Sequence, residues 1–158
     1  MNGLSDAQST QPVLYVEDHP INAMLMSAMF EYRPSLSLVL ASSVADALLR
    51  ARELNPVLLL LDLRLPDGDG RALLPMLRHI PGCESAPAVA VTAEAEFELR
   101  GSGFTELWSK PLDLHTMLRR LDALTPSAQT PPDVAHERPI DWPVERPQRH
   151  TTAVHRRL

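Results

Sequence analysis

The chain has 158 residues, of which 44% are apolar, so it is long enough for one domain with a buried core and a tail. Its net charge of −5 argues against a surface that binds nucleic acid, and no apolar run approaches the roughly 18 residues of a membrane-spanning helix. The N-terminus lacks the charged and apolar regions of a signal peptide, and the one cysteine, Cys83, allows no internal disulfide. We therefore expect a cytoplasmic protein that contacts neither nucleic acid nor membrane.

Short apolar runs alternate with amphipathic segments along the chain. We predict five strands, at residues 13–16, 36–41, 57–61, 88–92 and 107–109. We predict helices at residues 21–32, 44–54, 71–80 and 112–124, with at most a short helix at 94–99. This alternation predicts an α/β fold with a doubly wound parallel sheet and right-handed crossovers.

Composition divides the chain into three parts. Residues 125–158 hold six of the fifteen prolines and little apolar periodicity, which predicts a disordered or extended tail. We expect residues 1–11 to form an N-terminal tail and residues 12–124 to form the folded domain. Trp142 stands alone in the second tail, where it could anchor a partner or simply lie in a solvated linker.

Polar side chains stand at the ends of four predicted strands. They are Glu17 and Asp18, Asp62, Thr92 and Lys110. Because parallel strands end at one edge of a sheet, these side chains should lie close together, although Asp62 alone could merely begin a turn. Three neighbouring carboxylates repel one another and require a cation, and Mg²⁺ prefers carboxylate and carbonyl oxygens. Asp62 could then attack phosphorus, while Thr92 donates a hydrogen bond to one phosphoryl oxygen and Lys110 neutralises another.

Lysine occurs once in this sequence. The chain has fourteen arginines and one lysine, Lys110, and chance alone could produce this imbalance. An ammonium is a compact point charge, however, whereas a guanidinium is a planar fork. The exception indicates that position 110 requires an ammonium.

Four stretches resemble the receiver domain of response regulators. They are VLYVEDHPIN at 13–22, the Asp62 strand with LPDGDG at 65–70, AVTA at 90–93 and SKP at 109–111. The resemblance covers residues 13–124. It implies a flavodoxin-like, five-stranded parallel sheet of strand order 2-1-3-4-5, with about five helices of which the fourth is short or irregular.

The resemblance also implies the chemistry of the site. Asp62 would accept a phosphoryl group from a histidine kinase or a histidine phosphotransfer protein. The Mg²⁺ ligands would be Glu17, Asp18, Asp62 and the backbone carbonyl of Arg64. The phosphoryl group would contact Thr92 and Lys110.

The first helix supplies a candidate surface for the kinase. An apolar stripe at helical spacing predicts this helix, and its residues are Ile21, Met24, Leu25, Ala28 and Met29. Met26 and Phe30 lie off this stripe. We therefore expect these two residues, with Ile21 and Pro111, either to face the kinase or to pack under a loop.

Three features depart from the family pattern. The family carries a switch aromatic three residues before the lysine, where this chain has Leu107, and the adjacent Trp108 should face the opposite way. The interval from Thr92 to Lys110 is short by about one helical turn, so the fourth helix and the family's usual homodimer face are in question. We also expect that no output domain follows, and therefore that the chain acts by contact with an unknown protein target.

Two readings besides a phosphorylated receiver remain. A degenerate, unphosphorylated receiver would act only as an interaction platform or adaptor. An enzyme is disfavoured, since a phosphatase of the haloacid dehalogenase type needs a second acid two residues after its nucleophile, where this chain has Arg64. We therefore predict a signalling domain rather than an enzyme.

Overall fold

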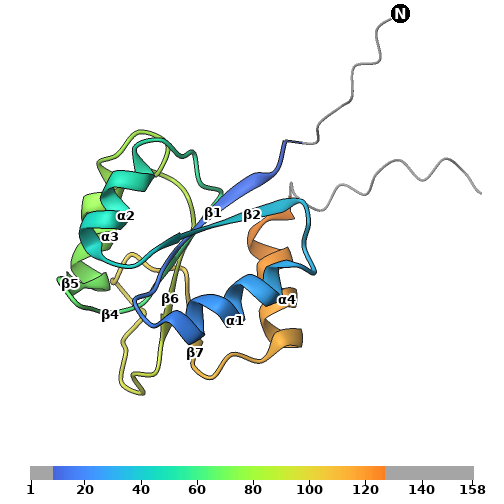
Figure 1. Cartoon of the computed structure of the whole chain (residues 1–158). Coiled ribbons are helices and arrows are strands. Elements are labelled where there is room, and N and C mark those ends of the chain that lie inside the picture. Colours follow the sequence, from blue (N-terminus) through green and yellow to red (C-terminus); the bar gives the residue numbers. More distant parts are fainter. Residues whose placement is uncertain (1–8, 127–158) are drawn as a thin grey trace, which may run out of the picture.

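The computed structural model describes residues 9–126. Most of the two predicted tails, including Trp142, lies outside these residues. The described residues form one central sheet, a small hairpin and four helices (Figure 1). None of these helices combines the length and the apolar character needed to cross a membrane.

The central sheet has five parallel strands in the order β2-β1-β3-β6-β7. Their bounds are β1 (Gln11–Val16), β2 (Leu36–Ala41), β3 (Leu58–Leu61), β6 (Ala88–Thr92) and β7 (Glu106–Ser109). The other two strands, β4 (Arg64–Leu65) and β5 (Gly68–Asp69), pair only with each other as an antiparallel hairpin. Counted along the chain, the five main strands have the order 2-1-3-4-5, so the predicted fold class is confirmed.

Helices cover both faces of this sheet (Figure 1). Their bounds are α1 (Pro20–Phe30), α2 (Val44–Ala51), α3 (Gly70–Arg78) and α4 (Leu114–Leu124). Helices α2 and α3 lie on one face, and α1 and α4 lie on the other. Alternate residues of β3 enter the two resulting cores, so that Leu59 and Leu61 face one and Leu58 and Leu60 face the other. Strand β3 is therefore buried on both faces.

The described chain has four helices, and the fourth of the five expected is replaced by an irregular segment, in line with the prediction that it is short or irregular. Residues 93–105 contain no helix in the described chain, so the segment at 94–99 is irregular. Glu94 and Glu98 would stand four residues apart on a helix, where like charges repel. Gly101 and Gly103 have φ of +74° and +85°, which turns the chain back toward β7.

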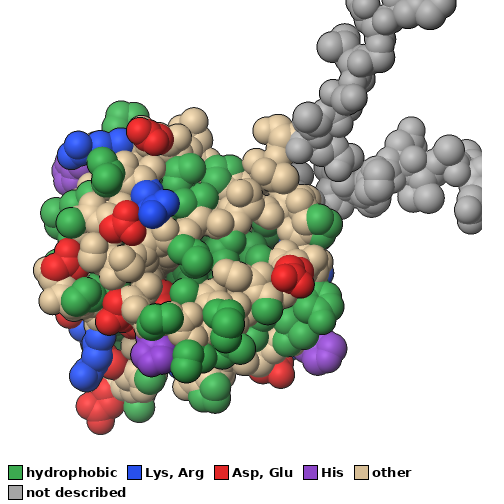
Figure 2. Space-filling model, in the orientation of Figure 1, with side chains coloured by type: hydrophobic (Ala, Val, Ile, Leu, Met, Phe, Trp, Pro, Cys, Tyr) green, Lys and Arg blue, Asp and Glu red, His purple; other side chains and the backbone are tan. Residues whose placement is uncertain are grey.

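Helix α1 decides between the two roles considered for Met26 and Phe30. Met26 and Phe30 are buried in the core, so the proposal that they face a kinase is wrong. Ile21, Met24 and Leu25 are instead 51–63% exposed. Figure 2 shows hydrophobic side chains gathered over the surface where α1 lies in Figure 1. Because α1 is apolar on both stripes, periodicity alone does not choose between them.

The loop after β3 is tied to helix α2. The carboxylate of Asp67 accepts the backbone N–H groups of Val44 (2.8 Å) and Ala45 (3.0 Å), the first two residues of α2. These two groups have no partner within the helix itself. The bonds hold the pKa of Asp67 below its ordinary value. The loop is therefore anchored to a neighbouring element as well as to the sheet.

We predict that Asp67→Asn lowers thermal stability near neutral pH. An aspartate with a lowered folded-state pKa stabilises the fold at pH values above its unfolded pKa of about 4, and this contribution is lost as the pH falls through the folded value. Thermal unfolding followed by circular dichroism should show a gap in Tm between wild type and variant that narrows in acid. A gap that stays constant from neutral to acidic pH would contradict this role.

Candidate functional site

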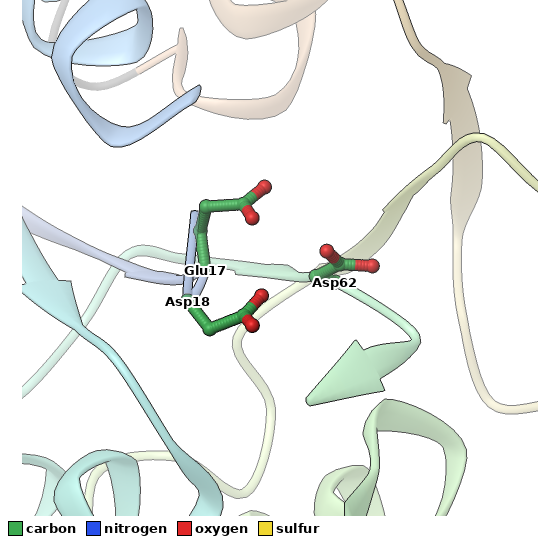
Figure 3. Close-up of side chains that lie close together, drawn as sticks. All are labelled: Glu17, Asp18 and Asp62. Carbon is green, nitrogen blue, oxygen red and sulfur yellow. The ribbon is translucent and has the colours of Figure 1, made fainter. Parts of the chain in front are cut away.

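Three carboxylates meet at one edge of the sheet. Glu17 and Asp18 follow β1, and Asp62 follows β3, the strand beside it. One oxygen from each group lies within 4.8 Å of an oxygen of the other two. In Figure 3 the side chains of Glu17 and Asp18 extend from the end of β1 toward Asp62. The structure therefore brings together the three predicted acids.

The backbone holds two of these acids in place. The N–H of Glu17 donates to the carbonyl of Ala41 at the end of β2, at 2.9 Å. The N–H of Asp62 donates to the carbonyl of Val16, also at 2.9 Å. Both acids thus continue the sheet's hydrogen-bond pattern, which fixes where their side chains begin.

Lys110, which follows β7, reaches into the acidic cluster. Its Nζ donates to Oε2 of Glu17 and, at 2.9 Å, to Oδ2 of Asp62. Both carboxylates are buried, with 4% and 7% of the residue exposed. Burial lowers the pKa of Lys110, but its hydrogen bonds to Glu17 and Asp62 outweigh that effect and raise it above the ordinary value. Lys110 is therefore charged and partly balances the cluster.

An open cleft of about 320 Å³ lies beside Asp62 and Lys110. Thr92, at the end of β6, lines it and is 2% exposed, and its Oγ1 accepts the N–H of Glu94 at 3.1 Å. The N–H of Arg64 donates to Oδ1 of Asp62 at 3.0 Å. The role of the Arg64 carbonyl as a metal ligand stays a prediction.

The rim of the cleft contains an ion pair that the sequence analysis missed. Glu94 accepts from Arg64 at 2.9 Å and also pairs with Arg71 of α3. The bonds from Arg64 and then Arg71 lower the pKa of Glu94. Arg71 also lies over the ring of Phe97 at 5.4 Å. The segment after Thr92 is thus attached to the loop after Asp62, although no sequence spacing indicates that contact.

Gly70 is a second residue that the sequence analysis missed. A Cβ at this position would lie 2.1 Å from the backbone oxygen of Asp62. Its N–H donates to the carbonyl of Leu63 at 3.0 Å. The repeated glycines of the DGDG turn indicate tight backbone geometry but not which one touches Asp62.

The cluster suits a small divalent cation. Three carboxylates and one ammonium leave two negative charges around one space, and carboxylate oxygens are hard ligands that Mg²⁺ accepts. Glu17 already accepts hydrogen bonds from four donors, whereas Asp18 is exposed. Asp18 and Asp62 therefore have more free coordination capacity than Glu17.

We predict that Gly70→Ala destabilises the fold by about 3 kcal/mol, the upper range for a buried steric clash. The added methyl group must displace the backbone of Asp62. Gly101→Ala is the matched control, because it has open space but a positive φ and should cost only about 1 kcal/mol. Urea unfolding of both variants measures the difference, and equal losses would contradict the contact.

We predict that Lys110→Met lowers the free energy of unfolding by about 3 kcal/mol without divalent cations, since buried carboxylates lose their counter-charge. Added Mg²⁺ should raise Tm more in this variant than in wild type. Arg64→Met is the control, because its ion pair is exposed to solvent and contributes little to stability. Thermal unfolding in EDTA and in Mg²⁺ tests this, and an unchanged Tm in EDTA would refute it.

Comparisons with known proteins match most of the described chain to one family. A family model described as the response regulator receiver domain matches residues 13–122. The signal transduction histidine-protein kinase BarA of Escherichia coli K12 is 30% identical over 122 residues, which cover 73% of this chain but only 13% of BarA. The polar-differentiation response regulator DivK of Brucella abortus is 31% identical over 109 residues, covering 66% of this chain and 88% of DivK.

Two solved structures show the same fold. The receiver domain of the sensor histidine kinase PA1611 from Pseudomonas aeruginosa has a TM-score of 0.64 and 26% identity, over 73% of this chain and 97% of that one. It was solved with a magnesium ion coordinated in its active-site cleft. The chemotaxis protein CheY4 of Vibrio cholerae has a TM-score of 0.67 and 20% identity, over 73% of this chain and 98% of that one.

Proposed function

The chain belongs to the response-regulator receiver domain family of two-component signalling, and we propose that it accepts a phosphoryl group on Asp62 from a histidine kinase or a histidine phosphotransfer protein. One observation carries the proposal. The buried carboxylate of Asp62 lies beside two further acids and the ammonium of Lys110, at the mouth of an open cleft. This is the arrangement that a nucleophile for phosphorus requires.

The transfer step exchanges one bond to phosphorus for another. A carboxylate oxygen of Asp62 forms the new P–O bond, while the P–N bond to the donor's histidine breaks. The electron pair of that bond stays on the imidazole nitrogen, which then takes up a proton. Lys110 neutralises one phosphoryl oxygen and the hydroxyl of Thr92 donates a hydrogen bond to another, because both residues line the cleft beside Asp62.

We propose Mg²⁺ as the cofactor, held by Glu17, Asp18, Asp62 and the backbone carbonyl of Arg64. The three clustered carboxylates support this assignment, as does the magnesium in the similar PA1611 domain. A magnesium ion bound there would supply positive charge to the phosphoryl oxygens. The protein contributes the fixed oxygens, and the N–H of Arg64 orients Asp62.

We propose that the phosphodonor docks on α1. The exposed side chains of Ile21, Met24 and Leu25 form an apolar surface on this helix (Figure 2). Helix α1 begins at Pro20, two residues after Asp18, so this surface starts beside the acidic cluster. Leu25 also lines a cavity together with Lys110. A donor bound there would reach Asp62 without crossing the domain.

We propose a cytoplasmic receiver, spanning residues 12–124, that acts by protein contact and performs no further enzymatic reaction. The family match over residues 13–122 supports these bounds. A second candidate, an unphosphorylated interaction platform, is favoured by the irregular segment at residues 93–105 and by Leu107 at the switch position. Leu107 and Trp108 pack on opposite faces of the sheet, so the tryptophan does not replace the missing aromatic.

Phosphorylation of the purified chain by acetyl phosphate, followed by intact-protein mass spectrometry, separates these two functions. We predict one added phosphoryl group in wild type with Mg²⁺. We predict none in Asp62→Asn, which lacks the nucleophile, and none in wild type with EDTA, which removes the cation. Asp67→Asn, an exposed acid in the same loop, is the matched control and should be labelled. Labelling of Asp62→Asn equal to wild type would sink the assignment, and an unlabelled wild type would favour the platform.

A further inference from the structure

The residue two positions before Glu17 is a buried tyrosine that the proposed chemistry has not used. Tyr15 is 1% exposed, and its ring packs in the core beneath α1 and α4. Its hydroxyl donates to Oε2 of Glu17 at 2.9 Å. A phenol in an apolar core needs a partner for its hydroxyl, and here that partner is the acid that also binds Lys110.

Glu17 distributes its hydrogen bonds unevenly between its two oxygens. Oε2 accepts from Tyr15, from Asn22 at 3.3 Å and from Lys110. Oε1 accepts only one of the four recorded bonds, from the N–H of His19 at 3.0 Å. Oε2 is therefore the anchoring oxygen, and Oε1 keeps more capacity for a cation shell.

The donors to Oε2 differ in how firmly they are themselves held. Lys110 divides its ammonium between Glu17 and Asp62, and Asn22 donates over a longer distance from the start of α1. Tyr15 belongs to a central strand and is 1% exposed, so the core packed around its ring restricts where the hydroxyl can lie. The tyrosine is thus the rigid member of the set.

The geometry points to Tyr15 as a positioning residue, which fixes the carboxylate of Glu17 so that Lys110 is held against Asp62. This inference rests on the proposed function for its consequence in phosphoryl transfer. Partners of this kind, one step removed from the reacting groups, orient the residues that do the chemistry. Tyr15 does not line the cleft beside Asp62; it reaches the cluster only through its bond to Glu17.

Lys110 provides a direct readout, because it is the only lysine of the chain. Protein labelled with ¹⁵N in lysine gives one side-chain ammonium signal, whose proton exchange with water reports how firmly Nζ is held. We expect Tyr15→Phe, which keeps the ring, to accelerate this exchange about tenfold, the factor typical of one hydrogen bond to a charged group. Tyr32→Phe removes the same hydroxyl from a residue that is 60% exposed, and should leave the signal unchanged.

A kinetic measurement separates positioning from simple packing. At saturating Mg²⁺, Tyr15→Phe should be phosphorylated by acetyl phosphate about tenfold more slowly than wild type, with little change in the KM for the donor. Tyr32→Phe should match wild type in both. If wild type itself takes no label, the proposed function fails, while the Lys110 exchange still decides the role of Tyr15.

A double-mutant cycle tests whether Tyr15 acts through Glu17. Exchange at Lys110 is compared in wild type, Tyr15→Phe, Glu17→Gln and the double variant. If Tyr15 holds Lys110 through Glu17, the Tyr15→Phe substitution should change the exchange at Lys110 less in the Glu17→Gln background than in wild type. Unchanged exchange in Tyr15→Phe, or equal effects in both backgrounds, would overturn the inference.

Discussion

Charge balance at the edge of the sheet is the constraint on which this structure depends. Glu17 and Asp62 are buried anions, and burying an unpaired charge is costly. Lys110 pairs with both, yet three carboxylates against one ammonium still repel. Only a rigid frame keeps such groups together, and the parallel sheet supplies it by ending β1 and β3 side by side. The apolar core thus offsets the cost of the acidic cluster at which we propose that a cation and a phosphoryl group bind.

The frame extends into segments that have little regular structure. The loop after Asp62 is fixed at three points: Asp67 binds the start of α2, Gly70 passes against the backbone of Asp62, and Arg64 pairs with Glu94. These contacts come from charges and close backbone approach rather than from helix or strand bonds. They explain how the chain keeps the surroundings of Asp62 ordered although residues 93–105 contain no helix.

The sequence was enough to predict the sheet and the meeting of the three acids, because both follow from simple patterns along the chain. A run of leucines in β3 indicates burial on two faces, and polar residues at strand ends must share an edge. It failed on α1, where Met26 and Phe30 form a second apolar stripe and either stripe could face the core. It also missed the contacts of Arg71 and Gly70, since approaches between separate segments leave no repeating pattern.

Strand β3 has a further consequence for how the molecule moves. It pairs with β1 on one side and β6 on the other, and all four of its residues are completely buried. Its amide groups therefore belong to the region that exchanges with solvent only when the whole domain opens. Asp62 follows this strand directly, so its backbone begins where a fully buried strand ends. If Asp62 takes the phosphoryl group as we propose, any local opening that follows must occur in the peripheral loops rather than in this strand.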